Sequence, residues 1–346
     1  MENNESQYRD IAQDPAALNG VLTRLGLART GETPRITALT GGVSSGIYRV
    51  DLASGSYCVK QALPKLKVAK EWLVPVERVF HEIAWLRAVD GIAPGHVPRV
   101  LGEDDASKAF VMEFLGPEYR NWKADMLAGR VDVQVARQVG DVLGRIHAAT
   151  ADNPAIAARF ATDENFYAIR LEPYLVETAR VHPALAHQLM ATVERTAATR
   201  RVLVHGDVSP KNILIGPAGR EDGPVLLDAE CAWFGDPAFD VAFCLNHFLL
   251  KAAHLPLHAK ALMDALDAFT RAYLAHVTWE PVDALEARVA TLLPGLTLAR
   301  VDGKSPVEYL GEPQRAKVRN VAMALVAQPP STIADIARRW AQEFNA

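Results

Sequence analysis

The stretch "VLVHGDVSPKNILI" at residues 202–215 places three side chains that could do chemistry in one short loop. Asp207 is followed by Lys211 and Asn212, and apolar, β-branched runs that are typical of buried strands flank the loop. Because strands on both sides would anchor the backbone, we expect Asp207 and Asn212 to point into one pocket. The stretch therefore indicates a catalytic loop.

A second group of acids follows in "VLLDAECAWFGDPAFD", where Asp228 comes 21 residues after Asp207 and Glu230 lies two residues further on. The side-chain oxygens of Asn212, Asp228 and Glu230 are hard ligands suited to Mg²⁺. Asp207 is then left to accept a proton from a substrate hydroxyl, which is the division of roles in phosphoryl transfer. Each acid alone is better explained as a surface group, since exposed acids are the default, but together and in this order they favour catalysis.

The neighbouring polar residues have structural explanations. His205 precedes a glycine beside an apolar strand, so a ring that bonds to the local backbone is expected. Asp236 precedes Pro237 in a turn, and Asp240 could cap or support the following helix and hold the catalytic loop. The role of Lys211 is left open: its side chain could steady a γ-phosphate, or it could face water.

The first third of the chain has features of a nucleotide site. The segment "TGGVSSG" lies between two expected strands, and its small residues could place backbone N–H groups over phosphates. The residues concerned are Gly41, Gly42, Ser44 and Ser45. Hairpin loops have a similar composition, so this segment alone is weak evidence.

Lys60 ends the strand that follows this loop, and a helix over 76–89 carries two acids, Glu77 and Glu82. A strand lysine paired with a helix glutamate can hold the phosphates of a nucleotide. Glu82 is the preferred partner and Glu77 a competing one.

The segment "FVMEFLG" at 110–116 precedes a mostly helical region. In such a connector, the backbone of Glu113, Phe114 and Leu115 could read an adenine edge while Met112 lines the pocket. It could equally be only a strand and its turn.

The hydrophobic pattern predicts the helices and strands that would position these candidate site residues. It predicts a helix within 11–29, three antiparallel strands within 35–63, the helix over 76–89 and another strand pair ending near Gly116. Helices are then expected over 131–149, 170–198, 239–252, 257–277, 282–293 and 312–345, with strands only at 202–204, 213–215 and 225–227. The prediction is an α+β protein with two lobes, 1–115 and 116–346.

Composition narrows the class of protein. A net charge of −4 gives no reason to expect a nucleic-acid or membrane partner, so the ligand is expected to be small. Three widely spaced cysteines suggest neither disulfides nor a zinc site. The first ten residues are polar and acidic, unlike a signal peptide, and a cytoplasmic location is expected.

The motifs "HGDVSPKN" and "LLDAECAWFGDPAFD" together resemble the signature of the aminoglycoside phosphotransferase and choline kinase superfamily, whose members have a two-lobed, protein-kinase-like fold. The resemblance implies ATP and Mg²⁺ as cofactors, with Asp207 as catalytic base and Asn212 and Asp228 as metal ligands. It also implies that Lys60 contacts phosphates, that Glu82 supports Lys60, and that residues 112–115 bind adenine.

Within the superfamily, "CVKQALPKLK" and "DAECAWFGDPAFD" look similar to the 5-methylthioribose kinase branch, which supports Glu230 as a metal ligand and makes a homodimer conceivable. Two features depart from that branch: Asn212 stands where it has Gly-Ser, and "LTLARVDGKSPVEYL" lacks its paired arginines. The acceptor is therefore expected to be the hydroxyl of a small polar metabolite, with methylthioribose as one candidate. Side chains considered for acceptor contact are Trp122, Trp233, Phe234 and Arg300.

Two alternatives remain from the sequence. One is an antibiotic phosphotransferase of the aminoglycoside type, although the mixed charge of the helical lobe does not favour a polycation. The other is a non-catalytic nucleotide-binding module, which the joint presence of Lys60, Asp207, Asn212 and Asp228 argues against. Fold alone does not choose among them.

Overall fold

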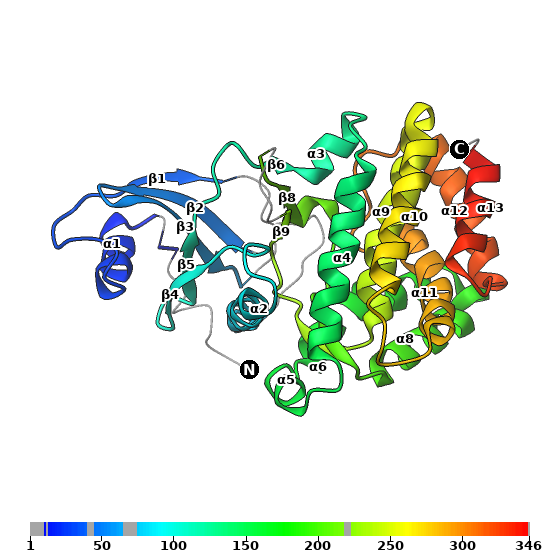
Figure 1. The fold of residues 1–346 in the computed structure, drawn as a ribbon, viewed down its shortest axis with the longest axis horizontal. Coiled ribbons are helices and arrows are strands. Elements are labelled where there is room, and N and C mark those ends of the chain that lie inside the picture. The colour runs from blue at the N-terminus through cyan, green and yellow to red at the C-terminus, as the bar shows by residue number, and fades with distance from the viewer. Residues whose placement is uncertain (1–9, 12, 40–44, 65–74, 218–222, 345–346) are drawn as a thin grey trace.

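The computed structural model describes residues 10–11, 13–39, 45–64, 75–217 and 223–344. Its N-terminal part is an antiparallel sheet with the strand order β1-β2-β3-β5-β4 (Figure 1). The strands are β1 (Arg35–Ala38), β2 (Ser45–Leu52), β3 (Gly55–Ala62), β4 (Val100–Asp104) and β5 (Ala109–Glu113). The three antiparallel strands predicted within 35–63 are confirmed.

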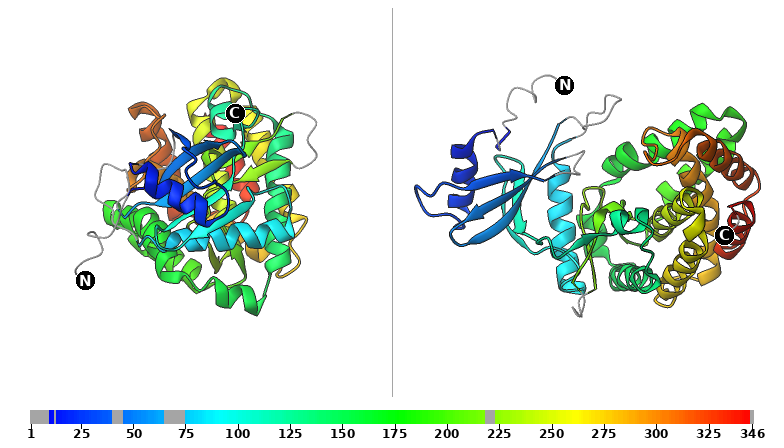
Figure 2. Two further views of the ribbon diagram at one scale, coloured as in Figure 1. Left: turned by 90° about the vertical axis from the view of Figure 1, so that its left-hand side faces the viewer. Right: turned by 90° about the horizontal axis from the view of Figure 1, so that it is seen from above.

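Two helices pack on this sheet, α1 (Pro15–Arg24) and α2 (Arg78–Ile92). Successive strand residues face opposite sides, so Val59 and Val111 pack in one cluster with α1, while Cys58 and Met112 belong to the core that includes α2. Figure 2 shows α2 on the side of the sheet that faces the helical part of the molecule. Side chains of α2 can therefore reach both parts of the chain.

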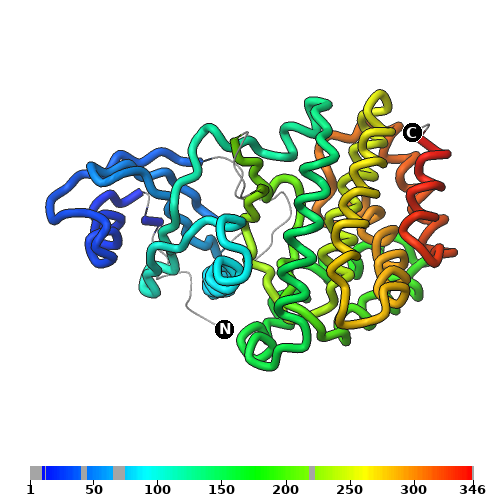
Figure 3. Tube along the Cα trace, viewed as in Figure 1, coloured from blue at the N-terminus to red at the C-terminus, as the bar shows by residue number. Residues whose placement is uncertain are grey.

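The rest of the chain is mostly helical. The longer helices are α4 (Val133–Thr150), α8 (Ala186–Ala198), α9 (Pro237–His254), α10 (Ala259–Leu274), α11 (Val282–Asp302), α12 (Glu312–Ala327) and α13 (Ile333–Phe344). Shorter ones are α3 (Trp122–Leu127), α5 (Pro154–Arg159), α6 (Asp163–Phe166) and α7 (Glu177–Val181), with the π-helix η2 (Tyr167–Val176) and the 3₁₀ turns η3 (Pro183–Leu185), η4 (Pro210–Asn212) and η5 (Pro256–His258). The trace in Figure 3 ends in α13, far from the sheet.

Helix α9 forms the centre of the helical part. Every residue from Pro237 to Ala253 is buried, with α10 and α11 packed against it. The helix begins where the Asp236 carboxylate accepts a hydrogen bond from the backbone N–H of Ala238 at 3.0 Å, and Pro237 suits the first helical position because it needs no partner for an N–H. A polar side chain on this helix must find its partners inside the protein.

Short strands hold the loop between the two parts. Strand β7 (Val202–Val204) pairs with β10 (Trp233–Gly235), while β8 (Ile213–Ile215) lies between β6 (Arg120–Asn121) and β9 (Pro224–Leu226). The loop that carries Asp207 therefore runs from one small sheet to another. The sequence had predicted β7 and β8, but not β6 or β10.

Prolines explain where helix lengths differ from the prediction. The helical stretch expected over 170–198 is divided: a π-helix runs through Pro173, and Pro183 starts a separate turn. The stretch expected over 312–345 is divided between α12 and α13 around Pro329 and Pro330. In contrast, α11 continues through Pro294 to Asp302.

No helix within the described residues is both long and apolar enough to cross a membrane.

Candidate active site

The backbone of the loop that carries Asp207 is held by Asp240 on α9. The Asp240 carboxylate accepts hydrogen bonds from the N–H groups of His205 at 2.7 Å and Gly206 at 2.8 Å. It also lies 3.3 Å from Nε2 of His147 on α4. Asp240 is fully buried, so these donors replace the water that its charge would otherwise bind. The central helix thereby fixes the loop.

Gly206 and His205 complete this loop. Gly206 has a φ of 79°, and a Cβ there would lie 2.7 Å from the carbonyl oxygen of Cys231, so only glycine fits. His205 Nδ1 accepts from the Asp207 N–H at 3.1 Å, which leaves Nε2 to donate to the Leu227 carbonyl at 3.0 Å. Burial lowers the pKa of His205, in agreement with this neutral tautomer. Its bonds are those of a structural residue, as the sequence suggested.

The Asp207 carboxylate is buried between two cations. Oδ2 lies 2.9 Å from a terminal nitrogen of Arg170 on η2 and 3.1 Å from Nζ of Lys211. Burial by itself raises the pKa of Asp207, but the charges of Lys211 and Arg170 outweigh it, and the pKa lies below its ordinary value. Asp207 is therefore ionised at neutral pH. Lys211, left open from the sequence, contacts Asp207 although its side chain is 41% exposed.

The backbone brings Asn212 and the Asp228 turn together, because the Leu227 N–H donates to the Asn212 carbonyl at 2.9 Å. The Asn212 amide donates to the Asp207 carbonyl at 3.1 Å, so its NH₂ group is engaged and its oxygen is the end available to a ligand. Asp228 follows β9 with a φ of 67°, a backbone conformation that is uncommon outside glycine and typical of functional turns.

Lys60 joins the sheet, α2 and the Asp228 turn. Its Nζ lies 2.7 Å from Glu82 Oε2 and 2.5 Å from Asp228 Oδ1, and both the lysine and Glu82 are buried. Glu82, and not Glu77, is thus the carboxylate in contact with Lys60. Burial raises the pKa of Asp228, but the charges of Lys60 and Lys211 and the hydrogen bond from Lys60 together outweigh it, so the net shift is downward. One ammonium group holds together residues from three separate elements.

Helix α2 contributes to a second ion pair. Arg78 Nε lies 2.9 Å from Glu230 Oε2, and other nitrogens of Arg78 donate to the carbonyls of Leu63 and Pro75. Glu230, a predicted metal ligand, therefore has one oxygen engaged by α2. The ring of Trp85, also on α2, packs edge-on against His205 with centroids 4.7 Å apart. These contacts tie the sheet to the loop that carries Asp207.

The predicted nucleotide-binding residues lie at the sheet end of this arrangement. Met112 pairs with Cys58 across β3 and β5, and Glu113 ends β5 with its N–H bonded to the Arg99 carbonyl. The next two residues, Phe114 and Leu115, lead toward β6, and the guanidinium of Arg49 lies 4.7 Å from the Phe114 ring centre. Ser45 is buried at the start of β2. The predictions for Gly41, Gly42 and Ser44 lie outside the described residues.

The residues considered for acceptor contact separate into two groups. Trp122 packs against Phe248, and Trp233 stacks on Phe166. Both tryptophans and Phe234 are buried, so these three aromatic residues belong to the hydrophobic core. Arg300 differs, because it lines a pocket that also contains Lys211.

Sequence reasoning missed Arg170 and Arg78, which contact Asp207 and Glu230. The sequence does contain a signal for Arg170, which lies between Ile169 and Leu171 in a buried helical segment. A charged residue in such a position needs a buried partner of opposite charge.

Comparisons with known proteins identify the family. Residues 35–285 match the model of the phosphotransferase enzyme family. Methylthioribose kinases from Klebsiella pneumoniae (27% identity, 57% of this chain and 55% of theirs) and Yersinia pseudotuberculosis (25%, 62% and 56%) are similar in sequence. The chain thus spans about half the length of these curated relatives.

Two solved structures share the fold at low identity. A choline/ethanolamine kinase family protein from Mesorhizobium loti has a TM-score of 0.51 at 14% identity, covering 95% of this chain and 99% of the other. A microcompartment-associated aminopropanol kinase has a TM-score of 0.53 at 16% identity, covering 97% and 98%. The prediction of an α+β, kinase-like phosphotransferase fold is confirmed, and since the family match covers most of the chain, this protein belongs to the phosphotransferase enzyme family.

Proposed function

We propose that this protein transfers the γ-phosphoryl group of Mg²⁺-bound ATP to a hydroxyl group of a small polar metabolite. The observation that carries the proposal is the buried contact of Lys60 with both Glu82 and Asp228. A nucleotide kinase needs a fixed cation at the phosphates and a carboxylate at the metal, and this cluster brings both together. Methylthioribose, named in the similar kinases, is one candidate acceptor.

ATP would bind mainly to the N-terminal part, with the lobe boundary after residue 115. Lys60, held in place by Glu82, contacts the phosphates, and the adenine lies against the segment from Met112 to Leu115. Ser45, at the start of β2, is the described residue of the glycine-rich loop that would lie near the phosphates. Lys60 is preorganised for this role because its ammonium group is already positioned by the buried Glu82 carboxylate and by Asp228.

The oxygen donors fit Mg²⁺. Among the residues that the structure describes, no three His, Cys, Asp or Glu side chains form a metal cluster by themselves. Mg²⁺ commonly binds through one or two carboxylates plus phosphate oxygens and water, so a complete protein cage is not needed. Asn212, Asp228 and Glu230 are the proposed ligands, and the bound ion would neutralise charge on the β- and γ-phosphates.

Asp207 acts on the acceptor. Both of its cationic neighbours contact Oδ2, so Oδ1 is the oxygen that accepts a hydrogen bond from the substrate hydroxyl. As the hydroxyl oxygen forms its bond to the γ-phosphorus, the bond to the β-phosphate oxygen breaks, ADP leaves, and the hydroxyl proton passes to Asp207. The lowered pKa makes Asp207 a weak base, which suits a loose transition state in which the proton moves late.

A screen for acceptor-dependent ADP release would test this function. The purified protein is incubated with Mg²⁺ and ATP over a library of hydroxylated metabolites that includes methylthioribose and aminoglycosides, and products are identified by mass spectrometry. We expect ADP release that depends on the acceptor, with an added phosphoryl group on the product. ATP binding without turnover of any acceptor would support a non-catalytic module instead.

The two acidic ligands proposed for Mg²⁺ are expected to differ in importance. Glu230 has one oxygen engaged by Arg78, whereas Asp228 occupies the strained turn beside Lys60. Asp228→Asn should raise the Mg²⁺ concentration for half-maximal activity by about tenfold or more, and Glu230→Gln by a clearly smaller factor. Titration of activity with Mg²⁺ measures both. Equal effects would show that Glu230 binds the metal as directly as Asp228.

A further inference from the structure

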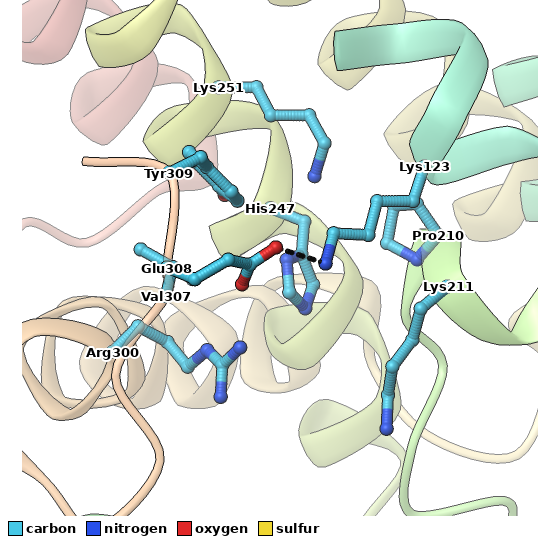
Figure 4. A pocket seen from close by; sticks show the side chains of 9 residues that line it. All are labelled: Lys123, Pro210, Lys211, His247, Lys251, Arg300, Val307, Glu308 and Tyr309. Carbon is cyan, nitrogen blue, oxygen red and sulfur yellow. Dashed lines mark hydrogen bonds and ion pairs between the residues drawn. The ribbon is translucent and has the colours of Figure 1, made fainter. Parts of the chain in front are cut away.

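A pocket of cationic side chains adjoins the catalytic loop. It is lined by Lys123, Pro210, Lys211, His247, Lys251, Arg300, Val307, Glu308 and Tyr309. In Figure 4 the nitrogen ends of Lys251, Lys123 and Arg300 are directed toward the space around the His247 ring. Lys211 connects this pocket to the proposed chemistry, since its Nζ lies 3.1 Å from Asp207.

Several polar atoms of this pocket are buried without a partner. Within the described part of the chain, Lys251 Nζ, both ring nitrogens of His247, Arg300 Nε and the Tyr309 hydroxyl make no hydrogen bond. Lys251 is fully buried and His247 is 6% exposed. A buried ammonium group without a hydrogen bond is costly, and proteins seldom keep one without a function. These unused donors indicate that a ligand completes the site.

The positions of these residues on α9 support a specific role. Asp240, His247 and Lys251 are seven and four residues apart, so they lie on one face of a helix that is mostly apolar and is buried from Pro237 to Ala253. Asp240 holds the catalytic loop. His247 and Lys251 continue the same face into the pocket. The polar face of α9 thus leads from the catalytic loop to the unpaired donors.

The charge balance of the pocket favours an anion. Lys123, Lys211, Lys251 and Arg300 are cationic side chains, and Glu308 is the one acid in the lining, where it lies 2.5 Å from Lys123 Nζ. Burial and the surrounding cations lower the pKa of His247, so its ring is neutral and adds no charge but can donate one hydrogen bond. A polycation such as an aminoglycoside, or a quaternary amine, would be repelled here.

We propose that this pocket binds an oxyanionic group of the phosphoryl acceptor, a carboxylate or a phosphate, so that the substrate is a hydroxylated anion. The inference rests on the proposed function, because it places the acceptor between Lys251 and Asp207. The donors of Lys251, Arg300, Tyr309 and His247 hold the anionic end, and the reacting hydroxyl points toward Asp207. A neutral sugar would leave these donors unpaired.

A direct binding experiment without nucleotide tests this proposal separately from catalysis. The wild-type protein is titrated by calorimetry with D-gluconate (a hydroxylated carboxylate), with ribose 5-phosphate (a sugar phosphate), with the neutral sugars ribose and methylthioribose, and with choline. We expect at least one of the two anions to bind more tightly than each neutral or cationic compound. Absence of binding by both anions, or equal binding of a neutral sugar, would overturn the proposal.

Lys251→Met is the diagnostic variant, because it keeps the length of the side chain and removes its charge. It should weaken binding of the anion by about tenfold or more. The matched control is Lys260→Met on α10, whose side chain is 81% exposed beside Asp264, and which should bind as the wild type does. Unchanged anion affinity in Lys251→Met would contradict the assignment.

Stability gives a second readout that also shows whether the variant folds. Burial, together with the charges of Lys123 and Arg300, lowers the pKa of Lys251 to about 7. Because the pKa of Lys251 is lower in the folded protein than in the unfolded chain, protonation of Lys251 favours unfolding. The resulting loss of folding stability is complete below pH 7 and disappears toward pH 10. Lys251→Met should therefore have a higher melting temperature than the wild type at pH 6, with the difference narrowing at pH 9.

The affinity for the carboxylate should also depend on pH. The charged or titratable groups around Lys251 are Lys123 from α3, Lys211 from η4, Cys244 and His247 from α9, Arg300 from α11, and Glu308 and Tyr309 from the segment before α12. A bound carboxylate favours protonated Lys251, so affinity should fall as the pH rises above 7, by up to about tenfold per unit. The Lys251→Met variant should lack this step, and a step that survives would exclude Lys251 as its source.

Discussion

Replacing Asp207 with asparagine is expected to lower kcat by about 10²- to 10⁴-fold, the range that a positioned proton acceptor usually contributes. The amide keeps the size of the side chain but cannot take the hydroxyl proton. It also removes the negative charge between Arg170 and Lys211, so the two cations no longer hold a fixed acceptor oxygen. The measurement is kcat with the acceptor identified in the ADP-release screen.

ATP affinity separates this effect from a loss of the fold. Lys60 and the connector from Met112 to Leu115 do not involve the Asp207 side chain, so Asp207→Asn should bind ATP within about threefold of the wild type. The matched control is Asp267→Asn on α10, which removes an exposed carboxylate paired with Arg271 and should leave kcat unchanged. If Asp207→Asn kept more than a tenth of wild-type kcat, Asp207 would not be the base.

The sequence predicted this fold well wherever the regular spacing of apolar residues is typical of either a helix or a strand. The antiparallel strands near Lys60, the helix α4 and the strands on both sides of Asp207 were found because each buries a regular set of apolar residues. Helix boundaries near Pro173 and Pro183 were not found, because a proline can either end a helix or be accommodated within one. Packing decides between these outcomes.

Apart from the pair Lys60 and Glu82, the candidate site was predictable where several of its residues share one segment. Asp207 and Asn212 share a loop, and Asp228 and Glu230 share another, so their spacing could be read directly. Arg170 and Arg78 come from distant helices, and nothing in their local sequence names Asp207 or Glu230 as partners. The cationic pocket could not be predicted either, because its lining residues come from separate segments of the chain. Its one local sign is the pair His247 and Lys251 on a helix whose other side chains are almost all apolar.

We expect helix α9 to link stability to catalysis through Asp240. Replacing Asp240 with alanine is expected to lower the free energy of unfolding by about 3–5 kcal/mol, the usual cost of removing one partner from a buried charged network. The N–H groups of His205 and Gly206 would lose their acceptor, and His147 would lose its contact with Asp240 and keep the hydrogen bond with Tyr273 at 2.8 Å. Chemical denaturation measures the loss, and Asp264→Ala, which removes an exposed pair with Lys260, should cost about 0.5 kcal/mol or less.

The conservative variant Asp240→Asn distinguishes a positioning role from a purely structural one. Asparagine keeps one acceptor oxygen, so it can satisfy His205 or Gly206 but not both with equal geometry. It should recover part of the stability while kcat stays low, because Asp207 follows directly on these two residues and its direction depends on both hydrogen bonds. If kcat recovered in proportion to stability, Asp240 would only hold the fold together. A low kcat in a stable Asp240→Asn protein, with ATP affinity unchanged, would show that the central helix aims the catalytic aspartate.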